Sequence, residues 1–300
     1  MTAVERAALL SKWIKPSAPD EVAQQERAQR MVTDAVSSWS ALSGASKRIY
    51  AKGSYANNTN VRRDSDVDIV VECHECRYFD YADDVTPYPS SGGSYTGSWT
   101  PAAWREAVRA ALVNKFGSSS VDSSGQLAIV VAAVQGSRTS IDVVPSFDYR
   151  RYLNAAGTRY YDGSCVHPKT GSKIVNWPAQ QLANGRQKND ATGKRYKNFV
   201  RALKNAENAL TKAGAITEKP SYLMECLVWN VANPTLCAGN LDQGFQATLV
   251  ELWAGLDDEQ MWRQWIEPNR LKWLFRGEKK WTVADARQVV LRTWQMLEYS

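Results

Sequence analysis

The stretch GSYANNTNVRRDSDVDIVVE, residues 53–72, decides the fold of the first half of this chain. Three of its apolar residues alternate with polar ones, as in a strand with one buried face: Val67, Ile69 and Val71. Asp66 and Asp68 therefore project together from the opposite face of this strand. A Gly53-Ser54 pair, typical of a tight turn, precedes Asp66 with eleven residues between them.

The whole-chain composition indicates a globular protein. Its 300 residues are 44% hydrophobic, which permits two domains or one large one with a real core. No apolar run is long enough to span a membrane and the first residues lack the pattern of a secretory signal, which predicts a cytoplasmic protein that does not bind membranes. The net charge of +6 favours polyanionic partners.

The five cysteines are scattered and odd in number, which is typical of reduced thiols in a reducing compartment. Cys73 and Cys76 form a C-x-x-C pair, but no second pair with zinc spacing follows. The sequence therefore predicts no structural zinc.

The first half, residues 1–150, is predicted to be a sheet lobe preceded by a long helix. The expected elements are a helix at 19–42, a short strand in RIYAKGS, the aspartate strand at 66–73, a helix at 101–116 and a hairpin of strands at 127–134 and 140–147. Residues 74–100 lack periodicity and indicate a long surface loop. Asp142 lies in the second strand of the hairpin.

The second half, residues 151–300, is predicted to be a connector followed by a helical lobe. Residues 154–194 are rich in Gly, Asn and Lys, which favours a connector. Helix-compatible segments follow at 195–213, 219–232, 240–254, 257–276 and 282–298. The tryptophans of this half are expected to serve packing. The predicted fold class is α+β, with a mixed sheet lobe packed on a C-terminal helical lobe.

Three aspartates on adjacent strands have a known chemical use. Carboxylate oxygens are the ligands that Mg²⁺ prefers, and two such ions activate a hydroxyl and stabilise a leaving pyrophosphate. A Gly-Ser turn at a strand-to-helix junction offers amides and a hydroxyl to a triphosphate.

These parts, in this order, resemble the signature of the DNA-polymerase-β-like nucleotidyltransferases. The matching residues are Gly53-Ser54, the eleven-residue spacer, Asp66-Val67-Asp68 and Asp142 in SIDVVP. Each part alone is a weak signal, because an isolated Asp-x-Asp is more often a solvated strand edge.

A finer resemblance covers nearly the whole chain. KGSYANNTNVRRDSDVDIVV, IDVVPSFDYRRYL and SKIVNWPAQQLANGRQKNDATGKRYKNFVRALKNAENAL look like the bacterial cGAS/DncV-like nucleotidyltransferases (CD-NTases) of CBASS anti-phage systems. The resemblance implies an active site in the cleft between the two lobes. It also implies a synthase that joins nucleoside triphosphates into a cyclic di- or trinucleotide second messenger.

The resemblance also assigns roles by position. Asp66, Asp68 and Asp142 would be the catalytic residues and would hold Mg²⁺, with Mn²⁺ as an alternative, while Gly53 and Ser54 would bind the donor triphosphate. Three residues of the second half would bind nucleotide: Lys204 and Ser221 through phosphates, and Tyr222 by stacking on a base. Lys204 is equally compatible with a solvated basic face, and Tyr222 with a core residue. Arg62 and Arg63 fit either phosphate binding or plain loop charges.

The partners that the resemblance implies are nucleoside triphosphates, CBASS accessory proteins that bind through the C-terminus, and an effector that senses the product. It also implies that the protein is a monomer and that it needs no nucleic acid. Residues 162–173 correspond to a lid that selects bases in the family; His167 fits base reading or an ordinary loop position. Two other functions stay open. One is a linear nucleotidyltransferase, similar to oligoadenylate synthases or poly(A) polymerases; the other is a non-catalytic nucleotide-binding module. The bases, ring size, linkage and trigger are not readable from the sequence.

Overall fold

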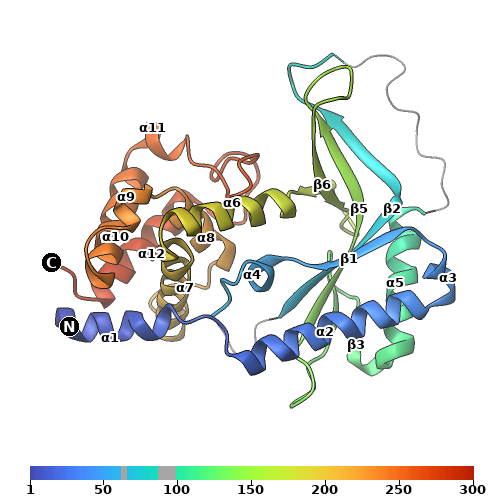
Figure 1. Cartoon of the computed structure of the whole chain (residues 1–300), viewed down its shortest axis with the longest axis horizontal. Helices are drawn as coiled ribbons and strands as arrows, with labels where there is room; N and C mark the ends of the chain where they lie inside the picture. The colour runs from blue at the N-terminus through green and yellow to red at the C-terminus, as the bar shows by residue number, and fades with distance from the viewer. Residues whose placement is uncertain (62–65, 87–98) are drawn as a thin grey trace. The chain divides into compact units, whose positions relative to one another are not determined.

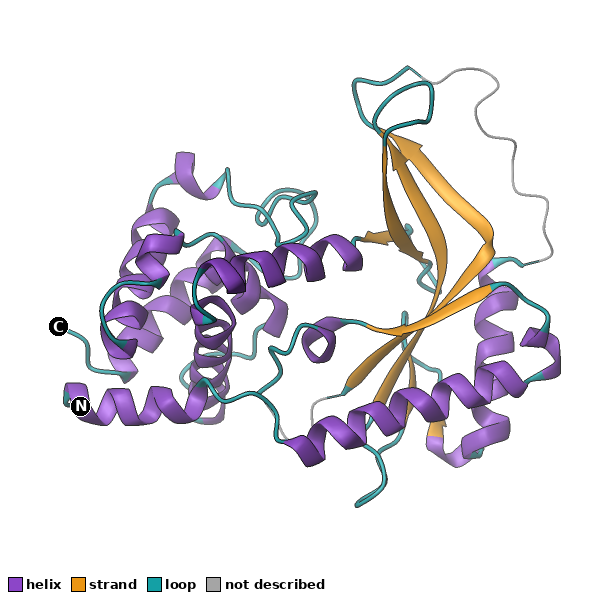
Figure 2. Ribbon diagram, in the orientation of Figure 1, coloured by secondary structure: helices purple, strands orange, loops and turns teal. Residues whose placement is uncertain are grey.

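The computed structural model describes residues 1–61, 66–86 and 99–300, and the chain divides into two compact units (Figures 1 and 2). The helical unit comprises Met1–Ser17, Ala56–Arg62 and Ala179–Ser300. The sheet unit comprises Ala18–Tyr55 and Arg63–Pro178. Arg62 and Arg63, for which the sequence leaves two interpretations, lie outside the described residues. Among the helices of the described ranges, none has both the length and the apolar character needed to cross a membrane.

The sheet unit is built on a seven-stranded sheet in the order β1-β2-β5-β4-β3, with β6 pairing with β5 and β7 with β6. The strands are β1 (Lys47–Ala51), β2 (Val67–Tyr81), β3 (Val121–Asp122), β4 (Ile129–Val131), β5 (Ile141–Tyr152), β6 (Tyr160–Val166) and β7 (Ile174–Asn176). The central pair β2–β5 is parallel and the other pairs are antiparallel. The sheet is therefore mixed, which confirms the predicted fold class.

One face of the central strand pair forms the core of this unit. The odd-numbered residues at its start are fully buried: Val67, Ile69, Val71, Ile141 and Val143. Helices α2 (Pro19–Ser38) and α5 (Pro101–Phe116) pack on each other and on the sheet. Trp104 of α5 packs against Phe147 of β5 and donates its indole N–H to the Val71 carbonyl at 3.0 Å. This is the helix-covered face of the sheet.

Three predictions for residues 19–194 are wrong in the bounds of their elements. The aspartate strand continues to Tyr81 instead of giving way to a loop at residue 74, because its second half pairs with Asp148–Tyr152 of β5 after a register shift between Cys73 and Arg77. The expected connector 154–194 contains β6, β7 and helix α6 (Pro178–Ala191). The helix that begins at residue 19 ends at Ser38, since Trp39 is extended, and the short helix α3 (Ser40–Ser43) follows.

The helical unit packs around α7 (Arg195–Lys212), and most of the buried residues of α7 are apolar. Its other helices are α1 (Ala3–Trp13), α8 (Ser221–Trp229), α9 (Asn233–Leu236), α10 (Leu241–Asp257), α11 (Glu259–Trp262) and α12 (Val283–Met296), together with α6. The predicted helix at 257–276 is wrong beyond α11, which ends at Trp262. Pro268 disfavours a helix in the segment that follows, and Asn269 accepts hydrogen bonds from the Leu271 and Lys272 amides there.

The described part of the spacer between the Gly-Ser pair and the first aspartate, residues 56–61, belongs to the helical unit. The carboxylate of Glu225, 3% exposed, accepts hydrogen bonds from Asn57 (3.3 Å), Thr59 (3.3 Å) and Gln181 (2.8 Å). Arg201 of α7 donates to the Asn58 carbonyl at 2.6 Å. The short helix α4 (Gly53–Ala56) leads from the sheet unit into this anchored segment.

We expect Glu225→Ala to lower the free energy of unfolding by about 2–4 kcal/mol, because two buried donors and the half-buried Gln181 lose their acceptor. Chemical denaturation of the purified protein measures this change. Glu259→Ala is the matched control, since Glu259 pairs with Arg263 on the surface of the same unit and its loss costs about 0–1 kcal/mol. Equal losses for both variants would contradict a structural role for the Glu225 contacts.

Candidate active site

Asp68 and Asp142 stand side by side because β2 and β5 run parallel in the register Asp68↔Asp142. Both belong to the even-numbered set, so they point away from the helix-covered face. Asp66, exposed, lies just before β2 begins and completes the group. The structure thus brings together the three predicted acids at one edge of the sheet unit.

The electrostatics of Asp142 reflect this crowding. Burial raises the pKa of Asp142 to about 6, the carboxylates of Asp66 and Asp68 add to the effect, and Lys52 opposes it. Among the described residues no set of three acid, histidine or cysteine side chains converges on one point as metal ligands do. As hard oxygen donors on adjacent strands, the three acids fit a divalent metal.

The Gly53-Ser54 turn lies against this group. The Lys52 amide donates to the Asp68 carbonyl at 2.9 Å, which ties the turn to β2. Gly53 has φ +70°, and a Cβ at this position would collide with the Asp68 carboxylate. Only glycine permits both the left-handed backbone and the close approach. Ser54 follows at the start of α4 and is half-buried.

We expect Gly53→Ala to cost about 2 kcal/mol of stability and to remove most activity, because the backbone must strain and the Asp68 carboxylate must move. Thermal unfolding and turnover of nucleotide measure the two effects. Gly44→Ala is the control in the same unit, since Gly44 has φ −87° and open space at its Cβ position. A Gly53 variant as active as the Gly44 variant would show that the close approach to Asp68 is dispensable.

Two residues of this face were missed by the sequence reasoning, Lys52 and Glu72. Glu72 is fully buried two steps along β2 from Asp68 on the same face, and Arg48 (3.0 Å), Tyr50 (2.9 Å) and His74 (2.8 Å) contact its carboxylate. The alternation that reveals the aspartates extends to Glu72. This continued alternation of polar and apolar residues is the signal in the sequence that could have identified Glu72.

The remaining predicted residues lie in the helical unit. Lys204 is 3% exposed, and its Nζ lies 3.3 Å from the Thr59 hydroxyl of the anchored spacer. Ser221 is exposed at the first position of α8. Tyr222 packs edge-on against Trp281, and its hydroxyl lies 3.4 Å from Glu267 Oε2. Their contacts with nucleotide stay predictions.

His167 follows β6 and packs away from the aspartates. Its ring contacts Tyr78 (centroids 4.6 Å apart) and Phe147 (5.7 Å), and Phe147 belongs to the helix-covered face. This placement argues against one of the two interpretations that the sequence leaves open for His167, the reading of a base held at the aspartates.

We expect Asp142→Asn to abolish activity while raising the stability of the metal-free protein at neutral pH by about 1 kcal/mol, or roughly 2–4 °C. The folded-state pKa of Asp142, about 6, exceeds its ordinary value of 3.8, so its ionisation destabilises the fold increasingly as pH rises through this window. Thermal unfolding with a chelator at several pH values measures the effect. The gain must vanish below pH ~4, where the carboxyl is protonated in both states; a gain that is independent of pH would contradict this account.

A mixed sheet that carries adjacent acids on a parallel strand pair, next to a glycine-serine turn, defines a nucleotidyltransferase fold and site. Three comparisons identify the family. Residues 183–298 match the model of the cGAS/DncV-like nucleotidyltransferase C-terminal helical domain. The chain is 35% identical over 289 residues to a cyclic dipyrimidine nucleotide synthase of Legionella pneumophila, covering 96% of each.

Two solved structures are similar over their whole length. The cyclic dinucleotide synthase of Elizabethkingia meningoseptica, solved with GTP and Apcpp, has a TM-score of 0.81, 28% identity and coverage of 98% of this chain and 99% of that one. The c-UMP-AMP synthase of Rhodothermus marinus, solved with Apcpp and Upnpp, has a TM-score of 0.84, 25% identity and coverage of 97% and 96%. The chain belongs to the family of cGAS/DncV-like nucleotidyltransferases. It is a nucleotidyltransferase, and its family uses a divalent metal.

Proposed function

We propose that this protein joins nucleoside triphosphates into a cyclic dinucleotide, or a cyclic trinucleotide, with release of pyrophosphate. The observation that carries the proposal is the Asp68↔Asp142 pairing with Asp66 beside it, since this is the acid arrangement that phosphoryl transfer by metal ions needs. The similarity to cyclic nucleotide synthases over 96% of the chain supports the cyclic product.

The catalytic role of the three aspartates is to hold Mg²⁺, with Mn²⁺ as a substitute. The metal supplies electrostatic stabilisation of the transferring phosphoryl group. Asp142 would also help to activate the attacking hydroxyl. Gly53 and Ser54 present backbone amides and a hydroxyl for the donor triphosphate.

The nucleotide contacts proposed for the helical lobe differ in how much the structure supports them. Ser221 is exposed at a helix start and fits a phosphate contact, and Tyr222, half-buried beside Trp281, would stack on a base through a face of its ring. Lys204 would have to leave its buried contact with Thr59 to reach a phosphate. The lobes are proposed as 1–150 and 151–300, with the nucleotides bound in the cleft between them.

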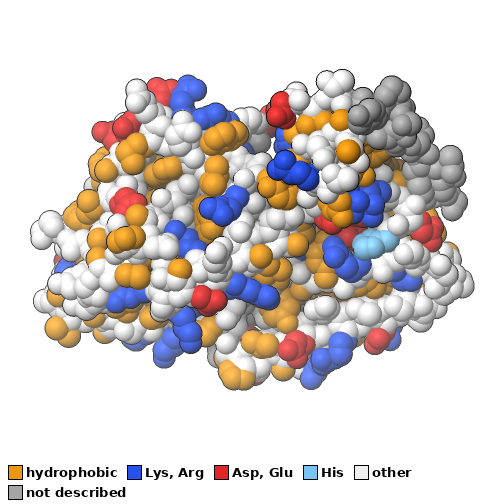
Figure 3. All heavy atoms as spheres, turned by 45° about the horizontal axis from the view of Figure 1, so that its top comes forward, with side chains coloured by type: hydrophobic (Ala, Val, Ile, Leu, Met, Phe, Trp, Pro, Cys, Tyr) orange, Lys and Arg blue, Asp and Glu red, His pale blue; other side chains and the backbone are white. Residues whose placement is uncertain are grey.

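Pyrimidine substrates are the first to test. The synthase of L. pneumophila, 35% identical, is named for cyclic dipyrimidine products. The proposed setting is a cytoplasmic anti-phage system in which the monomer needs no nucleic acid, accessory proteins bind near the C-terminus and an effector senses the product. The family resemblance supports these partners. On the face drawn in Figure 3, the Lys and Arg side chains are scattered, with acidic side chains among them.

We expect the purified protein to convert UTP, CTP or mixtures of triphosphates, with Mg²⁺, into a phosphatase-resistant product with the mass of a cyclic dinucleotide. Mass spectrometry after phosphatase treatment identifies it. Asp66→Ala/Asp68→Ala must lower the rate by at least about 10³-fold, because it removes two metal ligands.

Other outcomes distinguish the alternatives. A ladder of phosphatase-sensitive linear products would establish the linear polymerase instead. Saturable nucleotide binding without turnover, unchanged by Asp66→Ala/Asp68→Ala, would favour the non-catalytic module. A strict requirement for added DNA or RNA would contradict the proposed independence of nucleic acid.

A further inference from the structure

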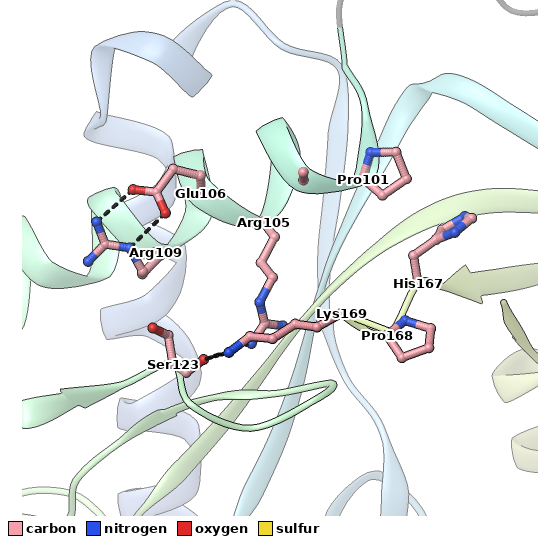
Figure 4. A pocket seen from close by; sticks show the side chains of 9 residues that line it. Pro101, Arg105, Glu106, Arg109, Ser123, His167, Pro168 and Lys169 are labelled. Carbon is pink, nitrogen blue, oxygen red and sulfur yellow. Dashed lines mark hydrogen bonds and ion pairs between the residues drawn. The ribbon is translucent and has the colours of Figure 1, made fainter. Parts of the chain in front are cut away.

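The sheet unit contains a cavity whose lining is rich in cationic side chains. It has a volume of about 530 Å³, within the usual range for small-molecule sites, and is lined by the start of α5, the β3–β4 turn and the segment after β6 (Figure 4). Pro101, Ser123 and Lys169 mark these three elements. The three predicted aspartates are not among its lining residues.

This cavity is distinct from the aspartate site. His167 on its wall contacts Phe147, which points to the helix-covered face, whereas Asp142 points to the other face. Phe147 also lies five residues along β5 from Asp142, a displacement of about 16 Å in an extended strand. A ligand here cannot contact the acids directly.

Two cations in the cavity are held together without a carboxylate between them. Arg105 and Lys169 both donate to the Ser123 carbonyl, at 3.3 Å and 2.6 Å, and Figure 4 shows the two side chains reaching toward each other. Their nitrogens therefore lie no more than about 6 Å apart, where like charges repel. The other acceptors of both side chains are backbone carbonyls, which satisfy hydrogen bonds without neutralising charge.

The acids nearby do not cancel this charge. Glu106 is bound by Arg109 through two hydrogen bonds, at 2.8 and 2.6 Å. Asp122 offsets part of the Lys169 charge, and its carboxylate also accepts the Ser124 amide. Helix α5 adds its positive N-terminal end, with no acidic residue in its first turn.

The other end of the cavity is flat and apolar. His167, Pro168 and Pro101 line it (Figure 4), and the His167 ring is held by Tyr78 and Phe147. Burial lowers the pKa of His167, and Lys173 lowers it further, so the ring is a neutral platform at neutral pH. An anionic group beside a flat ring matches this combination of two cations and an uncharged aromatic surface.

We propose that this cavity, formed by Arg105, Lys169 and His167 on the helix-covered face of the sheet, binds a nucleoside monophosphate at a site separate from the aspartates. The phosphate lies between Arg105 and Lys169, and the base lies on the His167 ring. The inference does not rest on the proposed synthase activity, because neither the aspartates nor a metal takes part.

The test is equilibrium dialysis of labelled AMP and UMP against the full chain carrying Asp66→Asn/Asp68→Asn, at low salt with a chelator. We expect one saturable site per chain. Adding Lys169→Gln keeps a donor for the Ser123 carbonyl but removes the charge, and should weaken binding about tenfold. Lys169→Arg should retain affinity. Lys115→Gln, in the last turn of the same helix, is the matched control and should change nothing.

His167→Ala tests the base platform. It should weaken AMP and UMP binding by at least fivefold, as expected for the loss of base stacking, and leave competition by inorganic phosphate unchanged. Equal affinity of the Lys169→Gln and Lys115→Gln proteins would overturn the proposal, as would the absence of saturable binding at millimolar nucleotide. Loss of synthase activity in any variant bears on the proposed function and not on this site.

Discussion

The parallel pairing of β2 with β5 is the constraint on which the rest of the structure depends. Its register is fixed by the apolar residues of the helix-covered face, because a slip of one residue would turn them all to the opposite face. Burial of Val67, Ile69, Ile141 and Val143 stabilises this register, and the same register holds Asp68 beside Asp142. The hydrophobic core and the acidic group lie on opposite faces of the same strand pair.

This coupling explains why the acids stay close although they repel one another. Carboxylates free to move would separate, but these are fixed by strands whose other face is packed under α2 and α5. Among the described residues that act on Asp142, Lys52 is the cation that opposes the repulsion. One ammonium does not neutralise three carboxylates, so a divalent cation would relieve the remaining repulsion and gain ligands that are already in place.

The acidic group could be predicted from the sequence because its signal is local. Alternation with period two placed Asp66 and Asp68 on one face, and the Gly-Ser pair marked the turn beside them. What could not be predicted depends on pairing between distant segments. The second half of β2 is aromatic and polar, with no alternation, and it is a strand because β5 offers a partner. Likewise, β6 carries a run of small residues that only pairing with β5 makes extended. Lys204 shows the same limit, since its burial depends on Thr59, 145 residues away in the chain.

The spacer shows how a single segment serves two structural requirements. Its two ends continue into the glycine turn and the aspartate strand of the sheet unit, while its middle is bound by Glu225 and Arg201 within the helical unit. A loop of this length that hung free in solvent would leave Gly53 to find its close approach to Asp68 against considerable conformational entropy. Buried polar contacts remove that freedom before any substrate binds. The side chains that hold the described part of this spacer, Glu225 and Arg201, lie far along the chain, and no local motif includes them.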